Sequence, residues 1–279
     1  MAHADERPDA ASTRSFTVAS YNVLATAYIH PAWYRRTPAM VLQPVWRIPA
    51  LTQRVASLAT DVICLQEVEP DKFAALRSRL GSMGYAGHYA RRQGGKPDGC
   101  ATFYRREIFD LAGARVIAYP DGGGDIALVV SLQSAGRVIA VANTHVAWEP
   151  PDAPSSAQRR RGKIRQLLAE CDGDAGQTWL VCGDMNTTPD SKLIAAFRHA
   201  GFEYAHHRLP ETHTCNVNGR AKTIDYLFYS AALRAEPQPL PRLSDETPLP
   251  SAAEPSDHLP VISRFYRSEE RRVGKECRL

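Results

Sequence analysis

The 279-residue sequence lacks the features that define several protein classes. Its six cysteines form no CxxC pair, which argues against a zinc finger or a disulfide scaffold. No apolar stretch approaches the roughly 20 residues that cross a membrane, and the first fourteen residues contain no apolar core of a secretory signal. A G-x-S-x-G motif, typical of serine hydrolases, is absent. We therefore expect a cytoplasmic protein with reduced cysteines and no membrane association.

The composition indicates one large globular domain. Apolar residues make up 44% of the chain, enough for a sizeable core, and the formal net charge is +4. This slight excess of basic residues tolerates an anionic substrate without requiring a nucleic-acid polymer. We predict a disordered segment over residues 1–14 and a single domain over 15–267. Residues 268–279 are charged and have no apolar face, so we expect a non-native or disordered tail there.

Hydrophobic periodicity predicts an α/β (α+β) fold. Apolar residues at helical spacing predict helices over about 47–59, 70–81, 155–171 and 191–199. Short apolar or alternating runs predict strands over 16–20, 61–67, 85–91, 100–105, 109–119, 126–132, 138–144, 179–182, 223–230 and 259–266. Several of these strands follow one another without an intervening helix. We therefore expect two packed sheets with helices outside, not a parallel βαβ series.

Polar residues mark the ends of many predicted strands. The apolar run 179–182 ends at Gly183, and Asp184 and Asn186 follow two residues apart, so in extended geometry both point the same way. Other strands end in, or are bordered by, further polar residues: Asn22, Glu67, His145, Asp225, Asp257 and His258. Each of these alone could be a turn former or a buried structural side chain.

If these strand ends meet, one cleft holds four acids, two asparagines and two histidines. This inventory suits metal-assisted hydrolysis of a phosphate ester, because a hard divalent cation prefers oxygen ligands and neutralises phosphoryl charge. Zinc is disfavoured, since the sequence offers neither an H-x-x-x-H motif nor a cysteine pair.

The order of the motifs resembles the endonuclease/exonuclease/phosphatase superfamily. These motifs are Tyr21-Asn22-Val23-Leu24, Leu65-Gln66-Glu67-Val68-Glu69, Asp98-Gly99-Cys100-Ala101, Asn143-Thr144-His145, Gly183-Asp184-Met185-Asn186, Ile224-Asp225-Tyr226 and Ser256-Asp257-His258. The second and third are similar to the branch of deadenylases, nocturnin and 2′,5′-phosphodiesterases. The resemblance implies a deoxyribonuclease I-like, four-layer α/β/β/α sandwich of two mostly antiparallel sheets. It also implies Mg²⁺ as the cofactor, with Mn²⁺ as an alternative.

The resemblance also implies roles for individual residues. Metal ligands would be Glu67, Asp257 and Asn22. Asp184 would orient or deprotonate the attacking water, and Asn186 would hold a phosphate oxygen or the metal. His145 would contact the phosphate or leaving oxygen, oriented by Asp225. His258 would stabilise charge developing at phosphorus, with Asp257 fixing its orientation or binding metal.

The substrate is a phosphate ester of a nucleotide or RNA under this resemblance. Trp148-Glu149-Pro150 resembles a deadenylase motif whose proline packs against a base, but Arg220 stands where those enzymes place a clamping phenylalanine. Arg220, Lys222, Arg92 and Lys96 could instead bind extra phosphates, and we assign Asp98 to the same substrate-binding set. Arginines over 159–165 form either a solvated helix face or a polyanion-binding face.

Three hypotheses follow from the sequence. The first is a magnesium-dependent phosphodiesterase or 3′-exonuclease. The second is a nocturnin-like phosphomonoesterase that removes the 2′-phosphate of NADP(H). The third is a catalytically silent nucleic-acid-binding module. The complete set of acids argues against it, because a silent relative would not need them. The leucine-rich repeats that recruit some deadenylases to partners are absent, so we expect no obligate protein partner.

Overall fold

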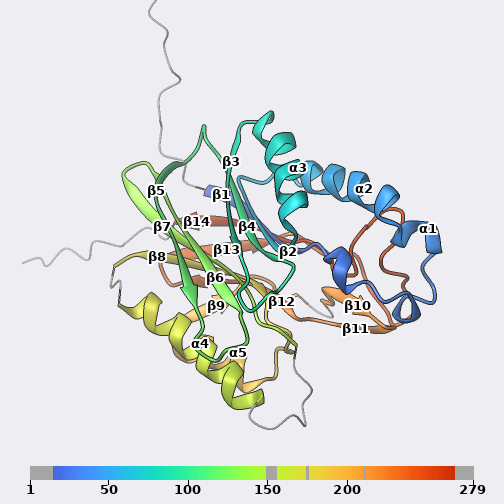
Figure 1. Ribbon diagram of the computed structural model, residues 1–279. Helices are drawn as coiled ribbons and strands as arrows, with labels where there is room; N and C mark the ends of the chain where they lie inside the picture. Colours follow the sequence, from blue (N-terminus) through green and yellow to red (C-terminus); the bar gives the residue numbers. More distant parts are fainter. Residues whose placement is uncertain (1–14, 149–155, 174–175, 210–211, 268–279) are drawn as a thin grey trace, which may run out of the picture.

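The computed structural model describes residues 15–148, 156–173, 176–209 and 212–267. Within these ranges the chain forms two six-stranded sheets and one short hairpin (Figure 1). The first sheet has the order β13–β14–β1–β2–β4–β3, with β1 (Ser15–Asn22), β2 (Val62–Val68), β3 (Tyr85–Arg91), β4 (Gly99–Arg105), β13 (Leu233–Pro237) and β14 (Val261–Arg267). The second has the order β5–β6–β7–β8–β12–β9, with β5 (Asp110–Ala118), β6 (Ile126–Ser134), β7 (Arg137–His145), β8 (Thr178–Asp184), β9 (Phe202–Tyr204) and β12 (Asp225–Ser230).

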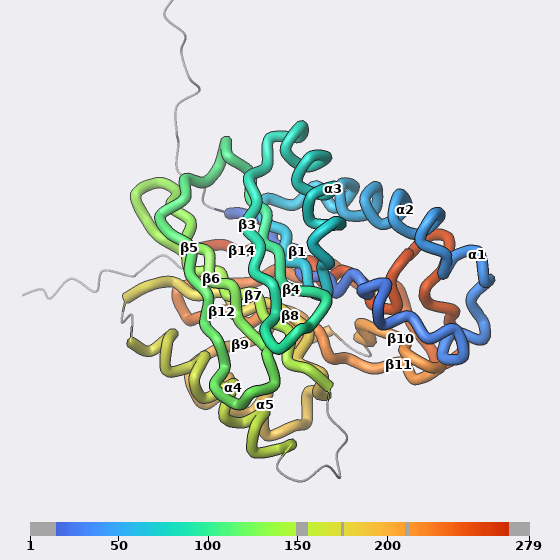
Figure 2. Tube along the Cα trace, viewed as in Figure 1, coloured from blue at the N-terminus to red at the C-terminus, as the bar shows by residue number. Residues whose placement is uncertain are grey.

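Both sheets are mostly antiparallel. Each contains one parallel pair, β1 with β2 in the first sheet and β7 with β8 in the second. The chain ends of the sandwich meet in the first sheet, where β1 and β14 pair as neighbours (Figure 2). The hairpin consists of β10 (Cys215–Val217) and β11 (Arg220–Lys222) and lies outside both sheets.

Helices cover the outer face of each sheet (Figure 1). The first sheet is covered by α2 (Pro44–Ser57) and α3 (Pro70–Gly81), and both begin with proline, which suits the first helical turn. The second is covered by α4 (Ser156–Asp172) and α5 (Lys192–His199), where the Ser191 side chain accepts from the Ile194 backbone nitrogen at the N-terminus of α5. Between β1 and α2 lie three short elements: η1 (Thr26–Tyr28), η2 (Pro31–Trp33) and α1 (Ala39–Leu42).

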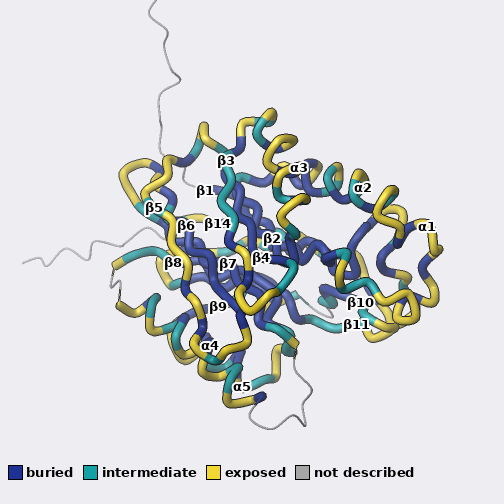
Figure 3. Tube along the Cα trace, in the orientation of Figure 1, coloured by how far each residue is buried: buried dark blue, intermediate teal, exposed yellow. Residues whose placement is uncertain are grey.

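Three apolar clusters hold these four layers together. One lies between the sheets and includes Val18 and Cys64 from the first sheet and Val130 and Leu180 from the second. The other two lie between each sheet and its helices, so the central strands are buried on both faces (Figure 3). The architecture confirms the predicted α/β/β/α sandwich of two packed sheets.

Two buried amides connect the sheets through hydrogen bonds. Asn143 of β7 donates from Nδ2 to the backbone carbonyls of Leu65 (3.1 Å) and Ala101 (2.9 Å) in the first sheet. The Oδ1 atom of Asn143 accepts from Nε2 of Gln66 at 2.8 Å. Because a buried amide costs free energy unless it is hydrogen-bonded, this set of bonds favours one relative position of the sheets. Gln66 directly precedes Glu67, and Asn143 lies two residues before His145. The same hydrogen bonds therefore also position the ends of these two strands.

The predicted helices and long strands match the observed ones to within a few residues. Four short strands, β9, β10, β11 and β13, were not predicted, because they have three to five residues and are only partly buried. The predicted disordered segment 1–14 and tail 268–279 lie outside the described residues. Five cysteines of the described ranges are free and buried. None of the helices described is long and apolar enough to cross a membrane.

Candidate active site

Polar side chains from both sheets meet at one end of the sandwich. Asn22 ends β1, and Glu67 lies near the end of the parallel strand β2. In the second sheet, His145 ends β7 directly opposite Asp184, which ends the parallel strand β8. Parallel neighbours end at the same edge of a sheet, so each sheet delivers two polar residues to this edge. The geometry brings the predicted strand-end residues together.

Asn22 links the two sheets at this edge. Its Nδ2 donates to Oε1 of Glu67 and to Oδ2 of Asp184, at 3.0 Å each. Its Oδ1 accepts from the backbone nitrogen of Leu24 at 3.0 Å, which fixes the orientation of the amide. Since one amide nitrogen contacts both carboxylates, Glu67 and Asp184 face a common space.

Glu67 has an unusual backbone conformation. Its φ is 58°, which is uncommon outside glycine, and the β2–β4 register shifts between Leu65 and Val68. Such a bulge re-aims a side chain. Oε2 of Glu67 accepts from the backbone nitrogen of Ala25 at 2.8 Å. Burial and the nearby charge of Asp257 raise the pKa of Glu67 to about 7, so ionisation of this carboxyl is costly without a cation.

Asp184 lies at the centre of the group. Its Oδ1 accepts from the backbone nitrogen of Asn186 at 2.8 Å. Its Oδ2 lies 3.7 Å from Nε2 of His145 and 3.7 Å from Nε2 of His258. Burial and the charge of Asp225, its cross-strand neighbour in β12, raise the pKa of Asp184 to about 6.

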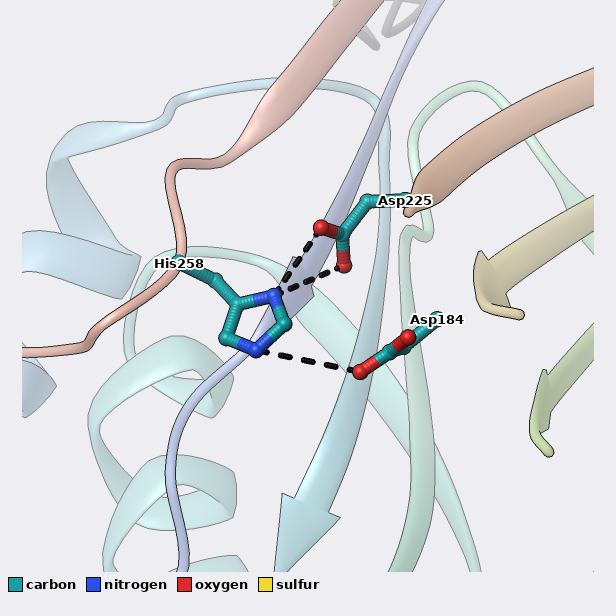
Figure 4. A group of neighbouring side chains, drawn as sticks. All are labelled: Asp184, Asp225 and His258. Carbon is teal, nitrogen blue, oxygen red and sulfur yellow. Dashed lines mark hydrogen bonds and ion pairs between the residues drawn. The ribbon is translucent and has the colours of Figure 1, made fainter. Parts of the chain in front are cut away.

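His258 is held by Asp225, as Figure 4 shows. Nδ1 of His258 lies 2.9 Å from Oδ2 of Asp225, and that oxygen also accepts from the Thr214 hydroxyl at 2.6 Å. Burial opposes a charge on the imidazole, but the carboxylates of Asp225, Asp257 and Asp184 outweigh it and raise the pKa of His258 to about 10. The ring is therefore cationic at neutral pH. The expected orienting partner, Asp257, lies 3.9 Å from Nε2 and is not hydrogen-bonded to it.

His145 is a neutral imidazole. Asn186 donates from Nδ2 to the Val146 carbonyl (3.0 Å) and lies 3.1 Å from Nε2 of His145, so Nε2 accepts and Nδ1 carries the proton. That Nδ1 is buried without a hydrogen-bond partner and lies 3.9 Å from Oε1 of Glu67. Burial, followed by the charge of Arg92, lowers the pKa of His145 well below its usual range. The expected pairing of Asp225 with His145 is wrong, because the strand register places Asp225 beside His258.

Asp257 binds Tyr34, a residue that no sequence motif indicates. The hydroxyl of Tyr34 donates to Oδ2 of Asp257 at 2.9 Å, and burial with the charge of Asp257 raises the tyrosine pKa well above its usual value. Tyr34 follows η2 in the aromatic segment after β1. No pattern in the sequence connects it to a residue 223 positions later.

The chemistry of the buried acids fits a divalent cation. Asp184, Asp225 and Asp257 lie within 4 Å of the cationic ring of His258, and Glu67 and Asp184 lie near the neutral ring of His145. None of the four acids forms an ion pair with a Lys or Arg of the described residues, although the charge of buried Arg47 also acts on Glu67 and Asp257. Four buried carboxylates beside one cationic imidazole leave an excess of negative charge, which a cation that prefers oxygen ligands would neutralise.

One possible ligand set is a cluster of Asp184, Asp225 and His258, whose ligand atoms lie within 4.8 Å of one another. In this set Nδ1 of His258 is already bound to Asp225, and a hard cation such as magnesium prefers oxygen to nitrogen ligands. The oxygen donors Glu67, Asn22, Asp184 and Asp257 are therefore better suited to hold the ion.

Two of the predicted substrate-binding residues contact each other. Arg92 donates from Nη2 to Oδ1 of Asp98 at 2.9 Å, and its Nη1 binds Asp125 at 3.1 Å. The hydroxyl of Tyr28 also donates to Oδ1 of Asp98. Both side chains are buried, and Asp98 has no exposed surface. Arg92 and Asp98 are therefore unsuited to direct contact with substrate, because their charges are already paired inside the protein.

The other predicted substrate-binding residues lie around the group. Lys96 is half-buried after β3, close enough for its charge to add to the effects of burial, Arg92 and His258 on the pKa of His145. Arg220 and Lys222 belong to β11, whose partner strand β10 bridges to His258 through Cys215. Arg220 is exposed and Lys222 half-buried. Pro150 lies outside the described residues.

The chain matches the model of the Endonuclease/Exonuclease/phosphatase family over residues 19–258. Among curated proteins it is 32% identical to Protein angel homolog 2 of Homo sapiens over 221 residues, which is 70% of this chain and 39% of the relative. It is 26% identical to the CCR4-Not complex 3′-5′-exoribonuclease subunit Ccr4 of Candida albicans, over 91% of this chain and 41% of the relative. The chain thus spans about two fifths of the length of these relatives.

Solved structures share the fold. The crystal structure of ANGEL2, a 2′,3′-cyclic phosphatase, in complex with adenosine-2′,3′-vanadate superposes with a TM-score of 0.81 at 26% identity, and covers 91% of this chain and 96% of that one. The human nocturnin catalytic domain with bound sulfate anion has a TM-score of 0.71 at 24% identity, over 91% of this chain and 94% of that one.

Proposed function

Because the chain belongs to the endonuclease/exonuclease/phosphatase family, as the order of its motifs predicted, we propose that it is a magnesium-dependent hydrolase of phosphate esters. Its substrate would be an RNA end or a nucleotide, and its preferred reaction that of a phosphodiesterase or 3′-exonuclease. One observation carries this proposal: the Asn22 amide lies between two buried carboxylates, Glu67 and Asp184, neither of which forms an ion pair with a Lys or Arg of the described residues.

The oxygens of Glu67, Asp257 and Asn22 would hold the ion. When bound, magnesium supplies positive charge to the phosphoryl oxygens and the leaving oxygen. Asn22 keeps Glu67 and Asp184 in fixed positions relative to each other. A bound cation would also offset the free energy that burial adds to the ionisation of Glu67, and so would lower the raised pKa of this carboxyl.

Asp184 would take a proton from the attacking water. Its pKa of about 6 lies nearer to neutral pH than that of an ordinary aspartate, which makes it a stronger base that is still ionised at pH 7. His258 would face the phosphorus centre as a cation. Asp225 binds the Nδ1 atom of this ring and raises its pKa, so the imidazole stays protonated at neutral pH. This fixed positive charge stabilises negative charge that develops on the phosphoryl oxygens.

His145 and Asn186 would contact the substrate as neutral groups. The protonated Nδ1 of His145 has no hydrogen-bond partner among the described residues, so we propose it as the donor to a phosphate or leaving oxygen when the site is occupied. Asn186 has a φ of 48° and is fixed by its bonds to the Val146 carbonyl and to His145. Both amide hydrogens are used by these bonds, so the lone pairs of Oδ1 remain to bind a cation or to accept from a water or hydroxyl in a fixed position.

A second reaction is favoured by one comparison. The similar ANGEL2 structure is that of a 2′,3′-cyclic phosphatase with adenosine-2′,3′-vanadate bound, so opening of a terminal cyclic phosphate is an alternative for this chain. The same cationic His258 and basic Asp184 would serve either reaction, because both proceed by attack of water at phosphorus.

Product analysis separates these reactions. The protein is first treated with EDTA and then assayed in Mg²⁺ or Mn²⁺ with three substrates: oligo(A), an oligonucleotide ending in a 2′,3′-cyclic phosphate, and NADPH. Release of mononucleotide from oligo(A) supports the exonuclease, and conversion of the cyclic end alone supports the cyclic phosphatase. Inorganic phosphate released from NADPH alone would identify the phosphomonoesterase. Full activity in EDTA, or no hydrolysis of any substrate in either metal, would refute the proposal.

A further inference from the structure

Helix α4 carries an unusual concentration of arginine. Residues 156–169 contain Arg159, Arg160, Arg161, Lys163 and Arg165 and no acidic residue. The inner side of the helix is buried against the second sheet through Ile164 and Leu167. The exposed side contains Arg161, Gly162 and Arg165, and is visible as the exposed part of α4 in Figure 3. We call Arg161, Gly162 and Arg165 the arginine face.

The arginine face has no ion-pair partner among the residues that the structure describes. Arg161 and Arg165 form no ion pair with any acid of the described ranges, whereas Arg115 nearby binds Glu170 at 2.8 Å. Arg161 and Arg165 are four residues apart, so their like charges are neighbours on the helix surface and lower its stability. An unpaired arginine pair of this kind is explained more readily by an anionic ligand than by folding.

Gly162 supports the same reading. A glycine inside a helix is destabilising relative to alanine, and structures usually retain it where another group packs closely. Here a Cβ built at Gly162 would meet nothing within 4 Å. Packing within the described chain therefore does not explain this glycine, and its exposed backbone leaves room for a ligand between the arginines. Gln158, Arg159, Arg161, Gly162 and Arg165 border a shallow, open hollow on the surface of α4.

The arginine face is continuous with the candidate active site through Arg160. This side chain turns inward from the same helix and donates from Nη2 to the carbonyls of Met185 (2.9 Å) and Asn186 (2.6 Å). Asn186 in turn contacts His145. Arg161 follows Arg160 on the same turn of α4, so the arginine face begins beside the residue that holds the Met185–Asn186 backbone.

We propose that the arginine face binds the sugar-phosphate backbone of single-stranded RNA whose end occupies the active site. This inference rests on the proposed function and extends it from a phosphate ester to a polymer substrate. Charge complementarity favours a polyanion, and no large apolar side chain of α4 is exposed, as an anchor in a lipid surface would require. The arginines provide affinity without reading bases, because they contact phosphates.

A binding measurement tests the arginine face without relying on catalysis. Anisotropy of a labelled short oligo(A) is recorded in EDTA at several KCl concentrations for wild type and for the double variant Arg161→Gln and Arg165→Gln. We expect about ten- to hundredfold weaker binding at low salt. The slope of log K against log salt should fall by about 1.4, or about 0.7 for each lost phosphate contact on a single strand. AMP should bind both proteins equally.

The matched control removes the same charge elsewhere. Arg77→Gln with Arg79→Gln alters two exposed arginines of α3, which covers the other sheet. The proposal would be overturned if both double variants lost the same affinity for oligo(A), or if the α4 variant lost none. It would also be overturned if the wild type bound oligo(A) no more tightly than AMP. Loss of binding to anionic vesicles without loss for oligo(A) would also overturn it and assign the face to a lipid surface.

Turnover of a small ester is measured in parallel. The α4 variant should hydrolyse it at the wild-type rate. Failure of the wild type to hydrolyse any ester would contradict the proposed function, while the binding result would still decide the role of the arginine face.

Discussion

Nδ1 of His258 lies 2.9 Å from the carboxylate of Asp225, and Nε2 of the same ring lies 3.7 Å from the carboxylate of Asp184. The two aspartates are directly opposite each other in the β8–β12 ladder. One imidazole therefore interacts with acids from two neighbouring strands. This relationship keeps the imidazole cationic at neutral pH, and loss of the Asp225 charge should be visible in the pH dependence of the reaction.

We expect Asp225→Asn to lower the pKa of His258 from about 10 toward its ordinary value. The alkaline limb of the kcat/KM profile should move to lower pH by at least about one unit, and kcat should fall by roughly 10²–10³-fold. Asp190→Asn is the control, because it removes the same charge from an exposed position in the adjacent loop. An alkaline limb that stays in place in Asp225→Asn would contradict the role of this pair.

Glu67→Gln should abolish most of the activity while leaving the fold intact. The loss should be roughly 10²–10⁴-fold in kcat/KM, since a principal cation ligand is removed. The metal-free variant should unfold at a temperature no lower than wild type, because burial already raises the pKa of Glu67 to about 7 and its charge is costly. Differential scanning calorimetry with and without Mg²⁺ checks both statements. A Mg²⁺-induced rise in Tm that equals that of wild type would refute this ligand assignment.

The stability of the metal-free protein should fall as pH rises above neutral. The folded pKa of His258, about 10, exceeds its unfolded value of about 6.5, so its contribution is complete below pH ~6.5 and is lost as pH rises through ~10. Between about pH 7 and 8.5 the free energy of unfolding should decrease by about 1–2 kcal/mol. Urea titrations in EDTA measure this change. His258→Gln should flatten the dependence, and an equal slope in both proteins would show that other groups cause it.

Much of the site follows from the sequence, because buried apolar strands that end in a polar residue place that residue at a sheet edge. Asn22, Glu67, His145 and Asp184 were located by this rule, and the structure brings all four together. The partners of the histidines did not follow. The partner of His258 depends on the β8–β12 register, which puts Asp225 beside it. The contact of Tyr34 with Asp257 likewise joins loops that are remote in sequence.

Charge alone was also a poor guide to substrate contacts. Arg92 and Asp98 border a glycine-rich loop and resemble phosphate-binding residues in the sequence, yet they bind each other and are buried. The same applies to Lys163 of α4, which pairs with Asp121 and Asp125 inside the protein. Only the fold distinguishes these internal ion pairs from Arg161 and Arg165, which face outward on the same helix.

Gly183 makes the most specific prediction about folding. Its φ is 147°, and a Cβ there would lie 1.8 Å from the carbonyl oxygen of Thr144 in the neighbouring strand. Gly183→Ala should therefore lower the free energy of unfolding by about 3 kcal/mol or more and displace Asp184. Gly113→Ala in β5 is the control, since a Cβ at that position meets nothing within 4 Å. Chemical denaturation compares the two, and equal stabilities would contradict this account of the β7–β8 contact.

The pairing of β1 with β14 has a consequence for biosynthesis. β1 is translated well before its partner β14, and Asp257 and His258 lie just before that strand. Until residue 267 has been translated, the first sheet has an open edge at β1 and the active site has neither its cation nor one of its acids. A chain that stops before residue 257 therefore lacks two polar groups of the candidate site, and it exposes a strand edge for chaperones to shield.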